Sequence, residues 1–180
     1  MLMLGCKPDG RVTEQHDIFF GIANNLKELI PRIKAFWPEA DGKIHIDVWR
    51  EVTAVDNYSI EIIENQDELP TENNLYFLNL GGYKAGDFEE YHYRMLAVAP
   101  EMSSAIKEAK KTTFYKHFGF KGATSHIDEK YGIDVDDSHK VGDLLDSETK
   151  VKYQIRITAS AVPLVEDELH IAYLTLKAIK

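Results

Sequence analysis

The segment FEEYHYRMLAVAPEMSSAIKEAKK, residues 88–111, decides how the fold of this chain is predicted. Pro100 would break a continuing helix but suits the first turn of a new one. After the proline, apolar residues recur at helical spacing, which predicts a helix there. Residues 88–99 are then a strand. This strand is expected to form a hairpin with the apolar and aromatic stretch LYFLNLGG, which begins at Leu75.

The same pattern occurs near the start of the chain, which indicates an internal repeat. At an offset of 76 residues, positions 4–34 and 80–110 share eight identities in 31 pairs. A typical composition would give roughly two. The match resumes where HID at 45–47 meets HID at 126–128. We interpret this collinear recurrence as a tandem duplication. The repeated pairs used below are Gly5 and Gly81, Gly10 and Gly86, Glu14 and Glu90, and His16 and His92.

The repeat predicts an α+β fold with a mainly antiparallel sheet and helices packed on one face. A helix in the first unit is expected after a cap at Asn24 or Asn25, and Pro31 is expected to kink or split it. Other strands are expected at 1–5, 11–23, 43–49, 58–63, 151–160 and 168–178. The predicted division is a first β-β-α-β type unit over 1–66, a linker over 67–74, a second unit over 75–146 and closing strands within 147–180.

The composition of the 180 residues is that of an ordinary soluble domain, with 44% apolar and 28% charged residues. The net charge of −9 argues against nucleic acid or an anionic membrane as the main partner. No apolar run is long enough to span a membrane. Cys6 is the one cysteine, so no intrachain disulfide forms, and a reducing, cytoplasmic location is expected. A catalytic role for Cys6 is disfavoured because Gly82 takes the equivalent place in the second unit.

The strand assignment changes the meaning of the repeated Glu-x-His motif. Residues i and i+2 of a strand project to the same face, so the carboxylate and the imidazole stand side by side. If the second and third strands of a unit are neighbours, a His-x-Asp pair joins them in one patch. Such a patch suits a divalent metal or a general base oriented by a carboxylate. The candidate ligands are Glu14, His16, His45 and Asp47 in the first unit and Glu90, His92, His126 and Asp128 in the second, with His16, His45, His92 and His126 as the metal-binding histidines.

A purely structural interpretation of these residues stays open. A strand with one wet face alternates polar and apolar residues, and Glu and His pair readily across strands. A duplication would also copy such residues without any function. Two-residue motifs are less specific than the longer metal-binding signatures.

Two further features have mainly structural interpretations. Gly10 and Gly86 recur at equivalent hairpin positions, which predicts a positive φ in each turn. The basic and aromatic segment KKTTFYKHFGFKG, residues 110–122, is expected to be a packed connection, although such a composition can also bind bases or a carboxylate. The sequence contains no nucleophile elbow, Rossmann fingerprint or Walker motif.

Four long stretches together resemble a bacterial family catalogued as a domain of unknown function, family 1543. They are LGCKPDGRxxEQHDIFFGIA, FWPEADGKIHIDxWREV, LGGYKAGxFEEYHYRMLAVAP and FYKHFGFKGATSHIDxKYGIDVDD. The resemblance extends to about Leu145 and includes the doubled domain. It implies a soluble bacterial protein and no particular reaction.

Two functional hypotheses follow from the sequence. The first is a protein that binds a small molecule or a divalent metal on the Glu-x-His and His-x-Asp faces, with enzymatic activity left open. The second is a non-catalytic interaction or assembly module that contacts a protein partner or forms a homodimer.

Overall fold

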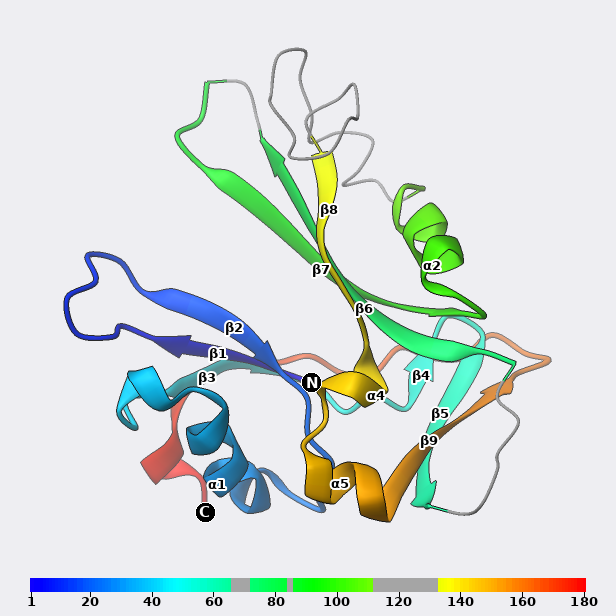
Figure 1. Ribbon diagram of the computed structural model, residues 1–180, viewed down its shortest axis with the longest axis horizontal. Helices are drawn as coiled ribbons and strands as arrows, with labels where there is room; N and C mark the ends of the chain where they lie inside the picture. Colours follow the sequence, from blue (N-terminus) through cyan, green and yellow to red (C-terminus); the bar gives the residue numbers. More distant parts are fainter. Residues whose placement is uncertain (66–71, 84–85, 112–132) are drawn as a thin grey trace.

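The computed structural model describes residues 1–65, 72–83, 86–111 and 133–180. The fold is α+β, with three antiparallel sheets and short helices. Two hairpins, β1–β2 and β6–β7, diverge from the centre of the molecule, with α1 and α2 on their outer faces (Figure 1). A third, smaller sheet lies on the opposite side of the centre from the hairpin tips. This arrangement leaves the inner faces of the two larger sheets turned toward each other.

The first sheet contains β1 (Leu2–Cys6), β2 (Gln15–Phe19), β3 (His45–Trp49) and β10 (His170–Thr175). Its order is β10-β3-β1-β2, with antiparallel neighbours throughout. Strand β1 is therefore central and is paired on both sides. The expected first and third strands are confirmed, and one of the two expected closing strands completes this sheet.

Helix α1 (Leu26–Phe36) covers the outer face of the first sheet. The Asn25 side chain accepts a hydrogen bond from the Glu28 backbone amide, which confirms the expected cap. Leu29 and Ile33 are buried against the sheet. The helix continues through Pro31, so the expectation of a split is wrong. The short η1 (Pro38–Ala40) follows the helix.

The second large sheet contains β6 (Asn74–Tyr83), β7 (Glu90–Ala99) and β8 (Ile133–Lys140) in the order β7-β6-β8. Helix α2 (Met102–Ala109) begins just after Pro100 and packs on the outer face through Ala105 and Ala109. The prediction of a strand before the proline and a helix after it is confirmed.

The two large sheets share one strand order. In each, the first strand of the unit lies between the second and the third, as β2-β1-β3 and β7-β6-β8. The second and third strands of each unit are thus not direct neighbours. The sequence prediction of a joint patch had assumed that they were, and this assumption is wrong. Gly10 and Gly86 have φ of 80° and 88°, which confirms the predicted positive φ in both hairpin turns.

One part of the repeat alignment is corrected by strand pairing. The sequence match placed 126–128 opposite 45–47, but 126–128 lies outside the described residues, and the strand that pairs with β6 is β8. The register of β3 on β1 skips Asp47, and the register of β8 on β6 skips Asp136. The structural counterpart of Asp47 is therefore Asp136. The sequence match was out of register because two short HID motifs coincided.

The third sheet contains β4 (Ala54–Val55), β5 (Tyr58–Glu64) and β9 (Tyr153–Ala159) in the order β4-β5-β9. Both the expected fourth strand of the first unit and the remaining closing strand are confirmed in it. Apolar side chains from this sheet meet those from β6 and β7 in a core that joins the parts of the molecule, including Val55, Ile60, Leu75, Phe77 and Leu96.

The chain between β8 and β9 forms two short helices that were not predicted, α4 (Val141–Leu144) and α5 (Ser147–Lys152). After β10, η2 (Leu176–Ala178) places Leu176 in the core beside α1. Within the described ranges, no helix is long and apolar enough to cross a membrane.

Asp146 ties α5 to α1. Its carboxylate accepts hydrogen bonds from the Thr149 amide at 2.9 Å and the Thr149 hydroxyl at 2.6 Å, and Arg32 Nη1 lies 3.4 Å away. Burial alone would raise the pKa of Asp146. The hydrogen bonds from Thr149 and the charge of Arg32 outweigh burial and hold the pKa below its ordinary value.

We predict that Asp146→Asn lowers the free energy of unfolding by about 0.5 kcal/mol at pH 7, because asparagine can still cap α5 but no longer places a negative charge beside Arg32 and the helix N-terminus. A carboxyl with a lowered folded pKa stabilises the fold above its unfolded pKa of about 3.9 and stops doing so as the pH falls through the folded value. Urea unfolding at pH 7 measures the loss of stability, and urea unfolding at about pH 2.5 tests whether this loss disappears when the carboxyl is protonated. Asp143→Asn is the control. A difference between parent and Asp146→Asn that is equal at both pH values would contradict the assignment.

Candidate functional site

Gly5 is the position around which the candidate site is built. It lies opposite His16 on β2 and opposite His45 on β3 at the same time. The two outer strands are roughly 10 Å apart, so their side chains can meet only above the central strand. A Cβ on Gly5 would overlap the His45 Nε2 atom and would lie 2.6 Å from Asp47 Oδ2. Because Gly5 has no side chain, a space is left above β1, and side chains from the two outer strands meet in this space.

Asp47 lies on the same face of β3 as His45. Ile46 pairs with Leu4, which belongs to the core beneath α1, and Val48 pairs with Met3 on the inner face. Alternation along the strand places Asp47 two residues from His45 on the inner side, where its carboxylate lies near His45 Nε2. The pairing of β3 with β1 skips Asp47, and this bulge places Val48 on the inner face as well.

The four candidate residues of the first unit converge. His45 Nε2 lies 3.2 Å from Asp47 Oδ1 and 3.3 Å from Glu14 Oε1. His16 Nε2 lies 3.3 Å from Asp47 Oδ2 and 3.8 Å from Glu14 Oε2. Metal–ligand bonds of 2.0–2.2 Å in tetrahedral geometry place neighbouring ligand atoms about 3.3–3.6 Å apart. Three of the four observed distances are near this range, but each carboxylate approaches the two imidazoles through different oxygens, so a single ion would require one oxygen of each carboxylate to turn toward it.

His45 is the most informative member of this cluster. It is only 3% exposed, yet its Nε2 atom has no hydrogen-bond partner among the described residues, and neither does Asp47 Oδ2. The carboxylate oxygens lie near Nε2 but not in hydrogen-bonding directions. A buried polar atom without a partner costs about 1–3 kcal/mol, and a bound ion would remove this cost by coordinating the atom. Two carboxylates beside neutral imidazoles leave a formal charge of −2, which suits a divalent cation.

Tyr173 fixes the ring of His45 from the side. The two rings have centroids 4.1 Å apart and an interplanar angle of 31°. Tyr173 comes from β10, more than a hundred residues along the chain from His45. Nothing in the local sequence pointed to this contact, because it depends on β10 joining the first sheet beside β3.

A second cluster lies on the inner face of the other large sheet. Ligand atoms of Glu90, His92 and Asp136 lie within 4.8 Å of one another. His92 Nδ1 lies 3.4 Å from Asp136 Oδ2, and His92 Nε2 lies 3.9 Å from Glu90 Oε2. A Cβ on Gly81 would overlap the carboxylate of Asp136. The pair of glycines identified in the sequence thus has the same role in both units.

The surroundings of the second cluster differ from those of the first. Asn79 Nδ2 lies 3.2 Å from His92 Nδ1, and the Asn79 amide also donates to Asp137 Oδ2 at 3.2 Å. Tyr83 donates a hydrogen bond of 2.8 Å to Glu90, and this bond raises the pKa of the Tyr83 phenol. The triad has one imidazole and is exposed, whereas the first cluster has two imidazoles, one of them buried.

The sequence found part of the second cluster. Glu90 and His92 were predicted, but Asp136 and Asn79 were not. The predicted His126 and Asp128 lie outside the described residues. Asp136 could have been found only through the strand register, because its equivalence to Asp47 appears in the matching bulges and not in the motif.

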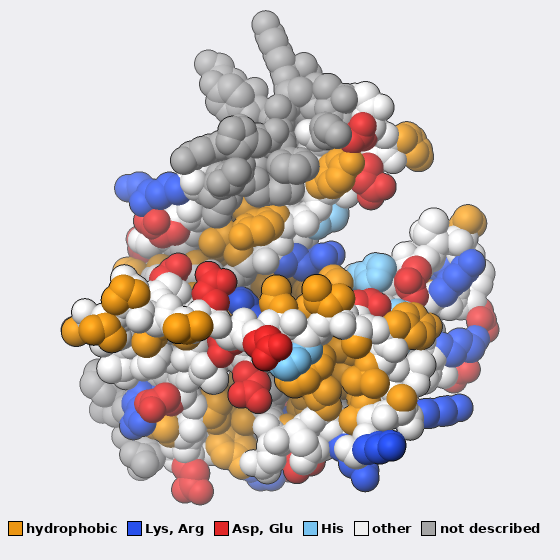
Figure 2. Space-filling model, turned by 180° about the vertical axis from the view of Figure 1, so that it is seen from behind, with side chains coloured by type: hydrophobic (Ala, Val, Ile, Leu, Met, Phe, Trp, Pro, Cys, Tyr) orange, Lys and Arg blue, Asp and Glu red, His pale blue; other side chains and the backbone are white. Residues whose placement is uncertain are grey.

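A cavity between the two large sheets lies beside the clusters, although none of the cluster residues lines it. Met3, two residues from Gly5, and Ile18, two residues from His16, line this cavity of about 440 Å³ together with Arg94, two residues from His92. Residues two apart on a strand share a face, so both clusters lie on the cavity side. Figure 2 shows the hollow between the sheets from behind, with histidine side chains on both sides of it and a basic side chain between them.

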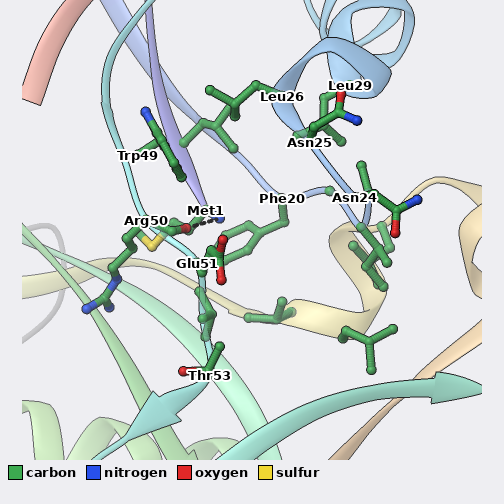
Figure 3. Close-up of a pocket in the computed structure, with 18 of the residues that line it drawn as sticks. Met1, Phe20, Asn24, Asn25, Leu26, Leu29, Trp49, Arg50, Glu51 and Thr53 are labelled. Atoms are coloured by element: carbon green, nitrogen blue, oxygen red, sulfur yellow. Dashed lines mark hydrogen bonds between the residues drawn. The ribbon is translucent and has the colours of Figure 1, made fainter. Parts of the chain in front are cut away.

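A larger cavity of about 870 Å³ lies elsewhere and has a different character. Figure 3 shows Phe20, Leu26 and Trp49 around it, with the polar Asn24 and Thr53 at its margin. Neither cluster lines this cavity. Its lining is mostly apolar and also includes Arg50, Glu51 and Lys180. No histidine is among the described residues that line it, so we place the candidate metal site at the clusters.

Cys6 is excluded from the site by its position. Its side chain is fully buried in the core beneath α1, on the face of β1 opposite the cluster, and burial raises the pKa of the thiol. A buried thiol with a raised pKa is a poor nucleophile at neutral pH. The basic segment over 110–122 is described only at its first two residues, so its predicted role is not addressed by the structure.

Comparisons with known proteins identify the fold and no activity. Residues 11–62 match the family described as Domain of Unknown Function (DUF1543), and this range contains all four residues of the first cluster. The chain also resembles the crystal structure of a protein Il1583 from Idiomarina loihiensis. The TM-score is 0.57 and the identity 22%, over 97% of this chain and 94% of that chain. No curated protein matches.

We predict that Gly5→Ala disrupts the first cluster. The added methyl group must displace His45 or Asp47, because the backbone of the central strand cannot move away from them. Displacing His45 is costly, since Tyr173 stacks on its ring. Overpacking of this kind costs about 1–3 kcal/mol, which urea unfolding would measure. Gly142→Ala is the control, since a Cβ at Gly142 meets nothing within 4 Å. Equal stability of Gly5→Ala and the parent would show that the site tolerates a side chain.

Proposed function

We propose that this protein binds a divalent transition-metal ion on Glu14, His16, His45 and Asp47. The observation that carries the proposal is the buried Nε2 of His45, which has no hydrogen-bond partner among the described residues although two carboxylates lie within 3.3 Å. Imidazole nitrogen and carboxylate oxygen together suit zinc, manganese, iron or nickel.

The competing interpretation is a set of ion pairs to protonated histidines. It accounts for the short nitrogen–oxygen distances but leaves the buried nitrogen of His45 without a directed hydrogen bond. A metal ion accounts for this nitrogen, because it accepts ligand atoms in directions that a hydrogen bond does not allow.

Glu14 is the ligand most suited to exchange with a bound molecule. Its side chain is 42% exposed, and its distance to His16 is the longest in the cluster. Catalytic zinc sites keep three protein ligands and one open position. His16, His45 and Asp47 would hold the ion, and Glu14 would either complete the shell or act as a base beside it. The ion would face the cavity, so a small molecule could reach it.

The second cluster is a weaker counterpart of the first within this proposal. It has one imidazole and exposed ligands, and we expect it to bind metal less tightly. We also propose that the two units arose by tandem duplication, which the shared strand order, the paired glycines and the matching bulges support.

We predict that Zn²⁺ or Mn²⁺ raises the melting temperature of the parent protein and that His45→Ala abolishes the effect. At a hundredfold excess over the dissociation constant, a bound ion stabilises the native state by about 2.7 kcal/mol. Neutral imidazole is the ligand form, so the effect should weaken in acidic buffer.

The controls separate the two units. His92→Ala should keep most of the effect, and His170→Ala, which removes a ring stacked on Trp49, should keep all of it. Elemental analysis of natively purified protein identifies the metal. Unchanged melting with zinc, manganese, nickel and iron, together with no copurified metal, would reduce the cluster to cross-strand pairing.

A second candidate function is self-association through β10. This strand is at the edge of the first sheet. Several apolar side chains on it and on the loop before it are exposed by more than half: Val162, Val165, Leu169, Ile171 and Tyr173. An exposed apolar edge strand is a template for pairing with another chain. The occupant we propose is the β10 strand of a second copy, related by a two-fold axis.

We predict that the parent sediments as a dimer and that Ile171→Lys sediments as a monomer, because a charge at the edge opposes strand pairing. Analytical ultracentrifugation measures both. Val151→Lys, at another exposed apolar position on α5, is the matched control and should not change the mass. A monomeric parent would leave metal binding as the sole proposal.

A further inference from the structure

Arg94 is partly buried and, unlike Arg32 and Arg156, has no good acceptor among the described residues. Arg32 contacts Asp146, Thr149 and the Ile22 carbonyl, and Arg156 contacts Glu61. The side-chain hydrogen bond of Arg94 goes to the Met3 Sδ atom at 3.7 Å. A thioether is a weak acceptor, and across the described part of the chain Arg94 has no ion pair. A cation is thus held at a cavity wall without an anion.

The surroundings of Arg94 favour binding of an anion. Apolar side chains of Met3, Ile18 and Val48 line the cavity beside it. Desolvation lowers the pKa of the guanidinium, and the charge of Asp17 partly offsets this effect. A guanidinium with little water around it forms strong bidentate hydrogen bonds with a carboxylate.

The position of Arg94 connects it to the first cluster. It contacts Met3, and Met3 is two residues from Gly5 on the same face of β1. Two residues of a strand span about 7 Å. The guanidinium therefore lines the cavity, and the strand face that carries the proposed metal ligands continues from Met3 beside it.

Three other charged residues also line the cavity, Arg50, Asp56 and Glu166. The two carboxylates come from the β4–β5 turn and the loop before β10. Arg94 contacts Met3 instead, and Met3 shares the inner face of β1 with Gly5 of the first cluster.

We propose that Arg94 binds one carboxylate of a short dicarboxylic acid whose other carboxylate ligates the ion at Glu14, His16, His45 and Asp47. This inference rests on the proposed function, since the second anchor is the metal ion. The substrate or ligand class is then a small organic acid that bridges the two walls of the cavity. Arg94 would bind one carboxylate of this acid, and the metal ion would bind the other.

The experiment titrates malonate, succinate and glutarate into zinc-loaded protein by isothermal calorimetry. We expect at least one of the three to bind the parent, and its affinity to fall about ten- to a hundredfold in Arg94→Gln, the typical cost of losing hydrogen bonds to a charged group. Zinc affinity, measured by competition with a chelator, should be unchanged in Arg94→Gln. Arg156→Gln removes the same charge on β9, outside the cavity, and should bind like the parent.

Arg94→Lys protects the test against a variant that fails to fold. It keeps the charge but loses the planar pair of donors, so the affinity for the best dicarboxylate should still fall. Equal dicarboxylate affinity in the parent and either Arg94 variant would overturn the inference, as would the absence of any binding to the zinc-loaded parent.

The two proposals fail in distinguishable ways. If the parent binds no metal, the proposed function fails, and titration of succinate into metal-free parent and Arg94→Gln decides the role of Arg94. Weaker binding by Arg94→Gln alone would support an anion site at Arg94. Equal binding, or none, would overturn that site as well.

Discussion

The site depends on the absence of one side chain. Antiparallel strands on either side of a central strand are too far apart for their side chains to meet, and any residue with a Cβ at position 5 would stand between them. Gly5 removes this barrier, and the ring of His45 occupies the place that a side chain would take. Gly81 does the same on the second sheet, where the carboxylate of Asp136 fills the space. A glycine inside a strand usually weakens it. Here the cost is offset by burial of β1 and β6 between two partner strands each.

The two units show how one frame can carry different groups of side chains. Both have the glycine, the bulge and the Glu-x-His pair, yet only the first has a buried imidazole opposite its glycine. The first cluster is also enclosed from the side by Tyr173 of β10. The second cluster is supported by polar groups, Tyr83 and Asn79, that hold its ligands by hydrogen bonds. Similar backbones therefore present a closed, nitrogen-rich group on one wall of the cavity and an open, oxygen-rich group on the other.

The sequence predicted the strands and helices that local patterns determine. It missed the contacts that depend on how the strands pair. Pro100 and the apolar spacing after it were enough to place β7 and α2, and Asn25 was enough to begin α1. The Glu-x-His motif gave the inner face of both hairpins, because alternation along a strand is local. It did not give Asp136, since a bulge has no signature in a single sequence, and the coincident HID motifs pointed to the wrong segment. Nothing in the sequence indicated Arg94 as a site residue either. Its significance comes from its contact with Met3, ninety-one positions away, and that contact exists only when the two sheets are folded together.

If the proposed ion binds at the first cluster, metal content becomes a measure of correct pairing between β3 and β1. Strands with a side-chain period of two tolerate no slip of a single position, because every side chain then changes face. If β3 docked on β1 one residue out of step, His45 would turn toward α1 and Ile46 toward the cavity, and the ligand group would not assemble. A chain trapped in that arrangement would still contain most of its secondary structure and would pass unnoticed by circular dichroism. The fraction of chains able to take up the ion would count the properly aligned molecules directly, which gives a quality assay for preparations of this protein.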